Sequence, residues 1–181
     1  MAITEPPFDE LRVTPSKAEG PPDAAASVEV TIRKFRLGDL GRVLEIERSS
    51  FAEQSYDRST FLYYAARGYA GFFVAEHRGE VAGYILTRRT GLFARPRRGG
   101  ITSVAVDQAY RRRGVGRQLA AAGLDFLRRW GARQVDLEVS VTNEPAIRLY
   151  EGLGFRRERP LPSYYGEAQD GMRMSLDLVQ T

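Results

Sequence analysis

The spacing of apolar residues along the chain predicts a regular succession of strands and helices. Apolar and polar residues alternate from Val28 to Arg33, which is typical of a half-buried strand. Apolar residues at helical spacing then predict a helix over residues 39–51. After a polar break, a second helix is expected to begin near Asp57 or Ser59, since both residue types are favoured N-caps.

The middle of the chain is predicted to contain three strands and a long helix. Residues 71–76 and 81–86 are apolar runs that predict the two strands of a hairpin. A basic loop that contains a proline is expected from Arg88 to Arg98. A central strand over residues 101–106 and an amphipathic helix over residues 117–130 follow.

The last part of the chain begins with a cleanly alternating strand over residues 134–141. Asn143 is then a plausible N-cap of a helix that Gly154 ends. Residues 156–159 and 172–176 predict two closing strands on either side of a loop. The mixed order of strands and helices predicts an α/β fold class.

The stretch from Ile101 to Arg117 has the pattern of an anion-binding turn. Gly114 and Gly116 open the helix, although each lowers helix propensity by roughly 1 kcal/mol. A cluster of arginines stands at the same end, where the helix dipole is already positive. A bound pyrophosphate would explain both features, because glycines expose backbone N–H groups and guanidinium groups add charged contacts. A solvated arginine-rich turn or a basic nucleic-acid patch is the alternative.

Three polar residues in the second half are candidates for chemistry. Glu138 lies on the polar face of its predicted strand, Asn143 precedes a helix, and Tyr150 lies on the apolar face of that helix. Each also has a structural interpretation. Glu138 could be solvated, Asn143 could be an N-cap alone, and Tyr150 could be a packed core tyrosine.

Two motifs resemble the GCN5-related N-acetyltransferase (GNAT) superfamily. The first is Arg111-x-x-Gly114-x-Gly116, placed between a strand and a helix, and the second runs from Leu137-Glu138 to Phe155. The second block is most similar to RimI-type enzymes, which acetylate an N-terminal alanine of a ribosomal protein, and to archaeal N-terminal acetyltransferases. The resemblance covers residues 28–178. It implies a mostly antiparallel, twisted central sheet of about six or seven strands, flanked by about four helices.

The resemblance also implies catalytic roles. Glu138 would be the general base that takes a proton from the ammonium acceptor through water, and Tyr150 would protonate the departing thiolate of CoA. Asn143 would hydrogen-bond the pantetheine, and backbone N–H groups of the central strand would polarise the thioester carbonyl. The residues implied to bind acetyl-CoA, the co-substrate, are Val104, Ala105, Val106, Arg111, Arg112, Arg113, Gly114, Val115, Gly116, Arg117 and Asn143.

The acceptor side is defined less sharply by the sequence. Tyr164 and Tyr165 resemble tyrosines that hold the first residues of a peptide in N-terminal acetyltransferases, and Phe51 and Tyr56 are further candidates. Ordinary packing is the alternative for the two tyrosines. The loop at residues 166–171 lacks the Gly-Glu-Asp-Ala order of that group, and the loop between the first two helices lacks the Pro-Trp pair of many RimI-type enzymes.

Three functions are consistent with these residues. The first is acetyl transfer to a protein N-terminus, including that of a ribosomal protein, and the second is the same transfer to a lysine side chain or a small amine. The third is a CoA-binding protein without catalysis or an arginine-rich nucleic-acid module. The presence of both Glu138 and Tyr150 argues against a protein without catalysis. An RNA module would show aromatic residues among its arginines, where only Tyr110 qualifies.

Composition excludes several classes of functional site. The chain has 181 residues, a net charge of +4, no cysteine and one histidine, which excludes disulfides, thiol nucleophiles and multi-histidine metal sites. We expect no metal, no membrane segment, no direct nucleic-acid contact and a cytoplasmic location. Residues 1–27 predict a disordered or loosely docked tail, and residues 28–181 predict a single domain that is a monomer or homodimer.

Overall fold

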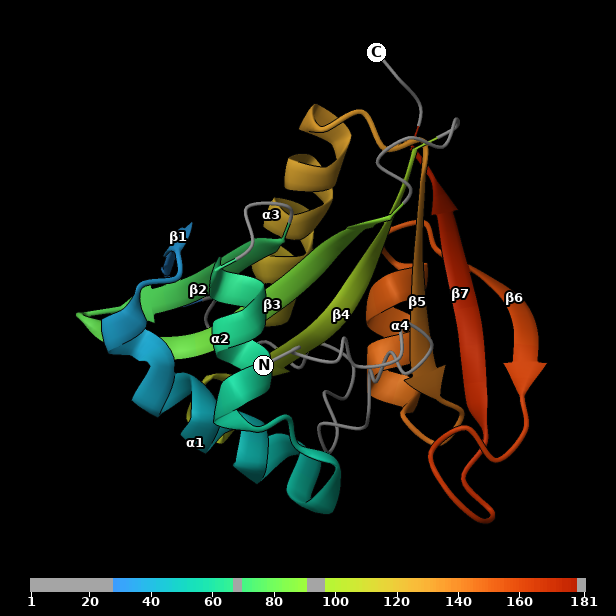
Figure 1. Ribbon diagram of the computed structural model, residues 1–181, viewed down its shortest axis with the longest axis horizontal. Coiled ribbons are helices and arrows are strands. Elements are labelled where there is room, and N and C mark those ends of the chain that lie inside the picture. Colours follow the sequence, from blue (N-terminus) through green and yellow to red (C-terminus); the bar gives the residue numbers. More distant parts are fainter. Residues whose placement is uncertain (1–27, 67–69, 91–96, 179–181) are drawn as a thin grey trace, which may run out of the picture.

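One seven-stranded sheet is the framework of the molecule. The computed structural model describes residues 28–66, 70–90 and 97–178, so the tail predicted at residues 1–27 lies outside the described part. The strand order is β1-β2-β3-β4-β5-β7-β6, as Figure 1 shows. Every neighbouring pair is antiparallel except β4 and β5, which run parallel. The strands are β1 (Thr31–Lys34), β2 (Gly71–His77), β3 (Glu80–Thr90), β4 (Arg98–Val106), β5 (Gln134–Ser140), β6 (Arg156–Leu161) and β7 (Gly171–Asp177).

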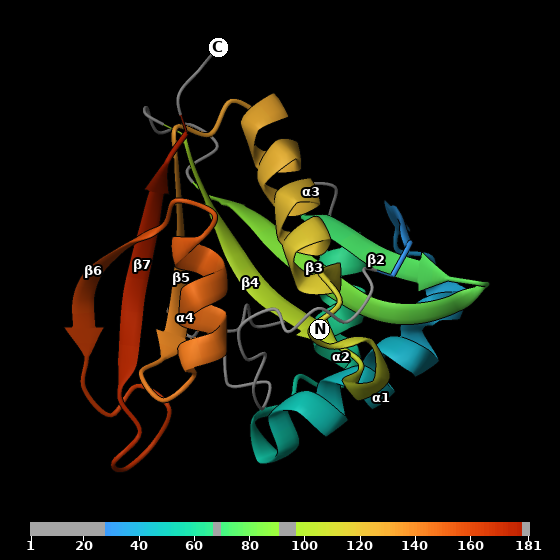
Figure 2. The same ribbon diagram turned by 180° about the vertical axis from the view of Figure 1, so that it is seen from behind.

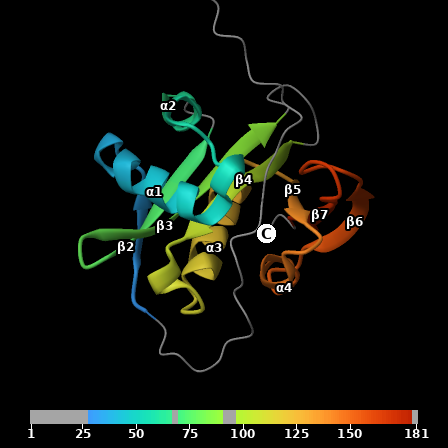
Figure 3. The ribbon, with the colours of Figure 1, turned by 90° about the horizontal axis from the view of Figure 1, so that it is seen from below.

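Two pairs of helices cover the two faces of the sheet. Figure 2 shows α3 and α4 on the face opposite α1 and α2, and Figure 3 shows the same layers from below. Each face has its own apolar core, one around Leu119 and Leu137 and the other around Phe61 and Tyr84. The sheet and its four helices confirm the predicted fold class. The helices are α1 (Leu40–Phe51), α2 (Arg58–Ala66), α3 (Val115–Arg129) and α4 (Glu144–Glu151), with short 3₁₀ helices at Leu37–Asp39, Ala52–Gln54 and Gln108–Tyr110.

The basic loop predicted from Arg88 to Arg98 was wrong at both ends. The strand β3 continues through Arg88 to Thr90, opposite residues 98–100 of β4. The guanidinium of Arg89 lies 4.5 Å from the ring centroid of Phe126 on α3. These partners are distant in sequence, so the short-range pattern could not reveal that the strand continues. Other boundaries differ less, since β1 begins at Thr31 and α3 begins at Val115.

The parallel strands β4 and β5 separate soon after they meet. They pair at Arg98–Gly100 and Gln134–Asp136, and no further pair joins them among the described residues. On the other side of β4, Leu86 pairs with Ser103 and Thr87 with Ile101, so Thr102 is an extra residue that forms a β-bulge. Figure 1 shows the two strands spreading apart from their meeting point. Residues 102–106 therefore have one backbone edge that β5 does not cover.

Candidate active site

The start of α3 fits the pyrophosphate of CoA. Gly114 is its N-cap and has φ of +79°, a left-handed conformation that favours glycine. A Cβ added at Gly114 would meet nothing within 4 Å, so the approach to the turn is open. The first N–H groups of a helix have no intrahelical acceptor, which leaves those of Val115, Gly116 and Arg117 available to an anion. This geometry supports the predicted cradle through its backbone.

The arginine side chains of the turn differ in their contacts. Arg111 donates from Nε to the Val106 carbonyl oxygen at 2.9 Å and from a terminal nitrogen to Ser50 Oγ at 3.2 Å. Arg117 donates to the Gly152 carbonyl oxygen at the end of α4, at 3.2 Å. Two of the four guanidinium groups are thus directed at protein acceptors. Arg112 and Arg113 are exposed to solvent.

The predicted thioester-polarising segment is the second half of β4. Val104, Ala105 and Val106 follow the bulge at Thr102 and lie on the strand edge that β5 leaves uncovered. Thr102 is fully buried, and its Oγ1 has no hydrogen-bond partner among the described residues. Such an orphaned buried hydroxyl costs free energy unless a ligand or water satisfies it. A buried hydroxyl without a recorded partner therefore directly precedes the segment predicted to polarise the thioester.

Glu138 is buried on β5 with one oxygen atom unsatisfied. Glu138 is 4% exposed, and its Oε2 has no hydrogen-bond partner among the described residues. The other oxygen, Oε1, lies 3.9 Å from Nε of Arg173. Burial raises the pKa of Glu138 from 4.5 to about 7, while the nearby Arg88 and Arg173 lower it and Asp136 raises it. A carboxylate with this pKa is suited to accept a proton near neutral pH.

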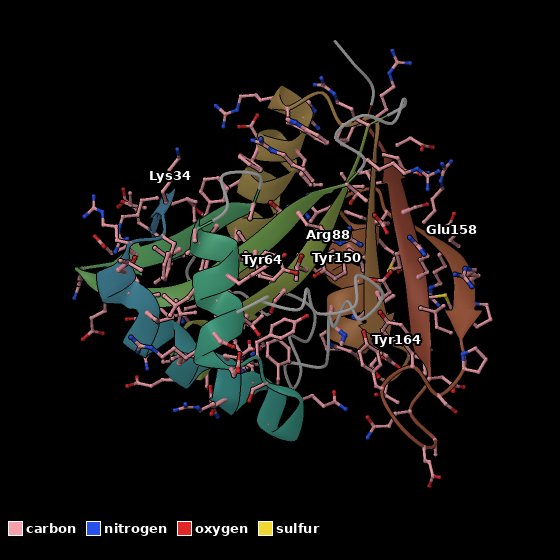
Figure 4. The ribbon with its side chains drawn as sticks, viewed as in Figure 1. Lys34, Tyr64, Arg88, Tyr150, Glu158 and Tyr164 are labelled. Carbon is pink, nitrogen blue, oxygen red and sulfur yellow. The ribbon has the colours of Figure 1, made fainter. Side chains whose placement is uncertain are left out.

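Tyr150 approaches from the other face of the sheet. It is fully buried in α4 and belongs to the same apolar core as Leu137 and Val139, whereas Glu138 alternates to the opposite side of β5. Its ring packs edge-on against Phe155, with 5.5 Å between the centroids. Figure 4 shows Tyr150 in the region where β4 and β5 diverge. The predicted acid and base are thus separated by the thickness of the sheet.

Asn143 is the N-cap of α4, as its position after the strand predicted. Its Oδ1 accepts a hydrogen bond from the backbone N–H of Ala146 at 3.2 Å, and Pro145 occupies the first turn. Asn143 is 3% exposed, so its remaining amide donors are confined to the protein interior near the end of β5. The predicted contact with pantetheine would come from these donors.

The two connections predicted to bind the acceptor touch one another. Gln54, after α1, donates from Nε2 to the carbonyl oxygen of Tyr165 at 3.0 Å and to Oε1 of Gln169 at 3.1 Å. The Tyr164 and Tyr165 rings form an edge-to-face pair with centroids 4.9 Å apart. Tyr165 is 7% exposed and Tyr164 is partly buried. Both tyrosine side chains are therefore largely packed against the protein, and Tyr164 exposes more of its surface to solvent than Tyr165 does.

Phe51 and Tyr56, the other two predicted acceptor-binding residues, differ in burial. Phe51 is 7% exposed and belongs to the apolar core on the side of α1 and α2. Tyr56 is partly buried and packs edge-on against Phe61, with 6.2 Å between the centroids. Tyr56 also lines a pocket of about 530 Å³ together with residues of α1 and α2. Of the two, Tyr56 is the one able to meet a ligand.

The comparisons with known proteins agree with this geometry. The model of the Acetyltransferase (GNAT) family matches residues 40–155. The chain belongs to this family. It is 35% identical over 164 residues to an N-alpha-acetyltransferase of Sulfurisphaera tokodaii, covering 86% of this chain and 98% of the relative.

Two solved structures show the same fold. The ribosomal-protein-S18-alanine N-acetyltransferase of Escherichia coli superposes with a TM-score of 0.73 at 27% identity, covering 84% of this chain and 96% of that one. The yncA protein of Salmonella typhimurium, solved with its cofactor acetyl-CoA, gives a TM-score of 0.72 at 27% identity, covering 84% and 96%. The protein is therefore an acetyltransferase with acetyl-CoA as co-substrate.

Two absences hold for the part of this acetyltransferase that the structure describes. No helix there is long and apolar enough to cross a membrane. Within the same residues, no three side chains of histidine, cysteine, aspartate or glutamate gather where they could hold a metal ion.

A buried hydrogen-bond network in this acetyltransferase was missed by the sequence analysis. Glu47 on α1 is 1% exposed, accepts from the Tyr84 hydroxyl, and accepts from the Tyr56 backbone N–H at 2.8 Å. The Tyr84 hydroxyl also lies 2.8 Å from Ser103 Oγ on β4. Burial raises the pKa of Glu47 from 4.5 to about 7. The network connects the segment before α2 to the centre of the sheet. The one sign of it in the sequence was a glutamate among the apolar residues of the predicted helix.

A cluster of charges beside Glu138 was also missed. Asp136 forms ion pairs with Arg173 on β7 and with Arg88 on β3, the second at 3.4 Å. The sequence placed Asp136 on the same face as Glu138, but Arg88 was assigned to a loop. The register of β5 against β7 pairs Glu138 with Arg173. Only strand pairing could bring these residues together.

Proposed function

We propose that this acetyltransferase transfers the acetyl group of acetyl-CoA to the N-terminal α-amine of a protein, as predicted from the sequence. The observation that carries the proposal is Glu138. It is a buried carboxylate on the face of α1 and α2, its Oε2 is unsatisfied among the described residues, and its pKa is about 7. An ammonium acceptor must lose a proton before it can attack a thioester, and a buried oxygen without a partner among the described residues supports Glu138 as the group that receives it.

The remaining residues supply binding and proton donation. Acetyl-CoA brings the acetyl group as a thioester, with its pyrophosphate at the start of α3. Glu138 accepts the proton of the acceptor through water, and Tyr150 donates its phenolic proton to the leaving sulfur from the opposite face. Asp107 donates its backbone N–H toward β3, so by alternation the N–H groups of Val104 and Val106 are the ones on the uncovered edge of β4 that would face the carbonyl oxygen. The neutral amine attacks the carbonyl carbon directly, with no covalent enzyme intermediate: the C–N bond forms and the C–S bond breaks. The second proton of the adduct nitrogen is released as the thiolate takes the proton of Tyr150, and it restores the phenol.

The acceptor region supports a peptide substrate. The segment after α1 and the β6–β7 connection meet through Gln54 and Tyr165, on the edge of the sheet where β4 and β5 have separated. Two sides of a peptide path would thus come from segments that are held together. The relatives named for N-alpha-acetylation and for S18-alanine acetylation favour a protein N-terminus, including a ribosomal one. We further propose a cytoplasmic monomer or homodimer without direct nucleic-acid contact.

The experiment that tests this proposal is acetyl-CoA turnover, measured as thiol release, against a matched panel of amines. The panel contains peptides with free N-terminal alanine, serine or methionine, the same peptides N-blocked with an internal lysine, and polyamines. We expect turnover only with free N-termini. Turnover confined to lysine or polyamine would keep the catalytic assignment and overturn the acceptor. Silence across the panel with CoA bound would favour a protein without catalysis.

A further inference from the structure

Glu138 lies beside a cluster of charged side chains that come from β3, β5 and β7. Asp136, two positions earlier on the same face, is 13% exposed at its side chain and pairs with both Arg88 and Arg173. Arg173 turns its Nε toward Glu138 Oε1 at 3.9 Å. Because one aspartate binds both guanidinium groups, each arginine is held in place instead of sampling solvent.

Arg88 reaches Asp136 only because residue 100 is a glycine. A Cβ built at Gly100 would lie 1.9 Å from a terminal nitrogen of Arg88, so the guanidinium occupies the space above the glycine. Gly100 is the last residue of β4 that pairs with β5, opposite Asp136. Arg88 therefore crosses β4 at the point where the two strands begin to separate. Figure 4 shows Arg88 in this region.

We propose that Arg88 and Arg173, both anchored by Asp136, are positioning residues for the catalytic base: Arg173 holds Glu138 Oε1, Arg88 adds a second fixed positive charge beside it, and Oε2 is left for the acceptor. This inference rests on the proposed role of Glu138. Burial alone would favour the protonated carboxyl, which cannot accept a proton. The two cations oppose burial and keep a usable fraction of Glu138 ionised near neutral pH.

Other charged residues also surround Glu138. Asp136 and Arg159, on β5 and β6, act on it in opposite directions, the aspartate raising its pKa and the arginine lowering it. Glu158 on β6 lies 3.6 Å from Arg173 Nε and competes for that guanidinium. Arg173 is 28% exposed, so its effect is partly screened. We therefore expect each cation to move the pKa of Glu138 by about one unit, the lower end for an adjacent opposite charge.

The test compares Arg88→Met, Arg173→Met and Arg173→Lys with the unchanged protein, using one peptide acceptor throughout. Loss of a cation stabilises the protonated carboxyl, so the acidic limb of the kcat profile should move up by about one pH unit. In the two methionine variants, turnover at pH 6 should fall about tenfold and turnover at pH 9 should change little. Arg173→Lys should return the acidic limb to nearly its original pH, because the lysine keeps the positive charge. Gly100→Ala should reproduce Arg88→Met, because the new methyl group displaces the guanidinium.

Arg157→Met is the matched control, since Arg157 is an exposed arginine on the neighbouring strand that pairs with Glu151. The pKa of Glu138 is also measured directly by NMR of carboxyl-labelled glutamate, with Glu138→Gln assigning the resonance. An unmoved limb and an unmoved resonance in both methionine variants would overturn the inference alone. Full activity and an unchanged limb in Glu138→Gln would instead overturn the base assignment of the proposed function.

Discussion

Glu138 and Tyr150 lie on opposite faces of one sheet. Leu137 and Val139 flank Glu138 on β5 and share the core of Tyr150, so the carboxylate alternates to the other side. The proposed base therefore faces the side of α1 and α2, and the proposed proton donor faces the side of α3, whose first turn is the proposed pyrophosphate site (Figure 3). An acceptor and acetyl-CoA can thus enter from different sides and meet where β4 and β5 separate.

Glu138→Gln tests the base directly. The amide keeps the size of the side chain but cannot accept the proton, so we expect turnover to fall about 10²- to 10⁴-fold. Affinity for acetyl-CoA, measured by calorimetry, should stay the same, because the predicted cofactor contacts lie on β4, α3 and Asn143. A rate close to that of the unchanged protein would remove Glu138 from this role.

The pH dependence of turnover follows from the same group. Glu138 must be ionised to act, and its pKa is raised to about 7, so activity should rise with pH through about 7 and level off above it. Below the limb, each pH unit should cost about tenfold. The α-amine of the acceptor titrates close to 8, so the profile is measured at saturating peptide and repeated with Glu138→Gln as reference.

Gly114→Asp and Gly114→Asn form a matched pair at the start of α3. Both side chains tolerate the left-handed backbone better than most, and both have similar size. The asparagine should weaken CoA binding by crowding the turn, and the aspartate should weaken it at least tenfold further by repelling the pyrophosphate. If CoA titration gave equal affinities for the two variants, the pyrophosphate would have to bind somewhere other than the start of α3.

Glu47→Gln should change how stability depends on pH. The folded-state pKa of Glu47 is about 7 against 4.5 when unfolded, so the folded state binds this proton more tightly and loses stability as pH rises from 4.5 to 7. That difference corresponds to about 3 kcal/mol. The glutamine resembles the protonated carboxyl, so its stability relative to the unchanged protein should increase with pH.

The measurement is urea unfolding at pH 5 and pH 8. Glu45→Gln is the control, because Glu45 lies on the same helix with a side chain 64% exposed. We expect its effect to be the same at both pH values. A Glu47→Gln effect that does not vary with pH would show that Glu47 is ionised throughout.

Gln54→Ala should loosen the acceptor side alone. It removes the contacts of Nε2 with the Tyr165 carbonyl oxygen and with Gln169, so we expect KM for the peptide to rise several-fold while KM for acetyl-CoA stays constant. Gln169→Ala removes only the second contact and should have a smaller effect. Initial-rate kinetics with both substrates varied provide the measurement, and a rise in KM for acetyl-CoA would contradict the assignment.

Local patterns in the sequence were sufficient for the elements and for part of the site. The alternation over residues 134–141 predicted β5 and the polar face of Glu138, and Asn143 was predicted as the cap that the structure shows. The glycines at residues 114 and 116 predicted the opening of α3. These features depend on dihedral angles and hydrogen bonds within a few residues, so short-range spacing is enough to reveal them.

The surroundings of the base were decided by tertiary structure alone. Arg88 and Asp136 are 48 positions apart in the chain, and Tyr84 and Glu47 are 37 apart, yet each pair is in contact. These contacts depend on the register of β3, β5 and β7 and on the packing of α1 against the sheet, which no short stretch encodes. The sequence by itself was sufficient for the family and for most of the elements, and it nominated Glu138 as the base. Its charge environment required the folded sheet, because the groups that tune a buried carboxylate act through space.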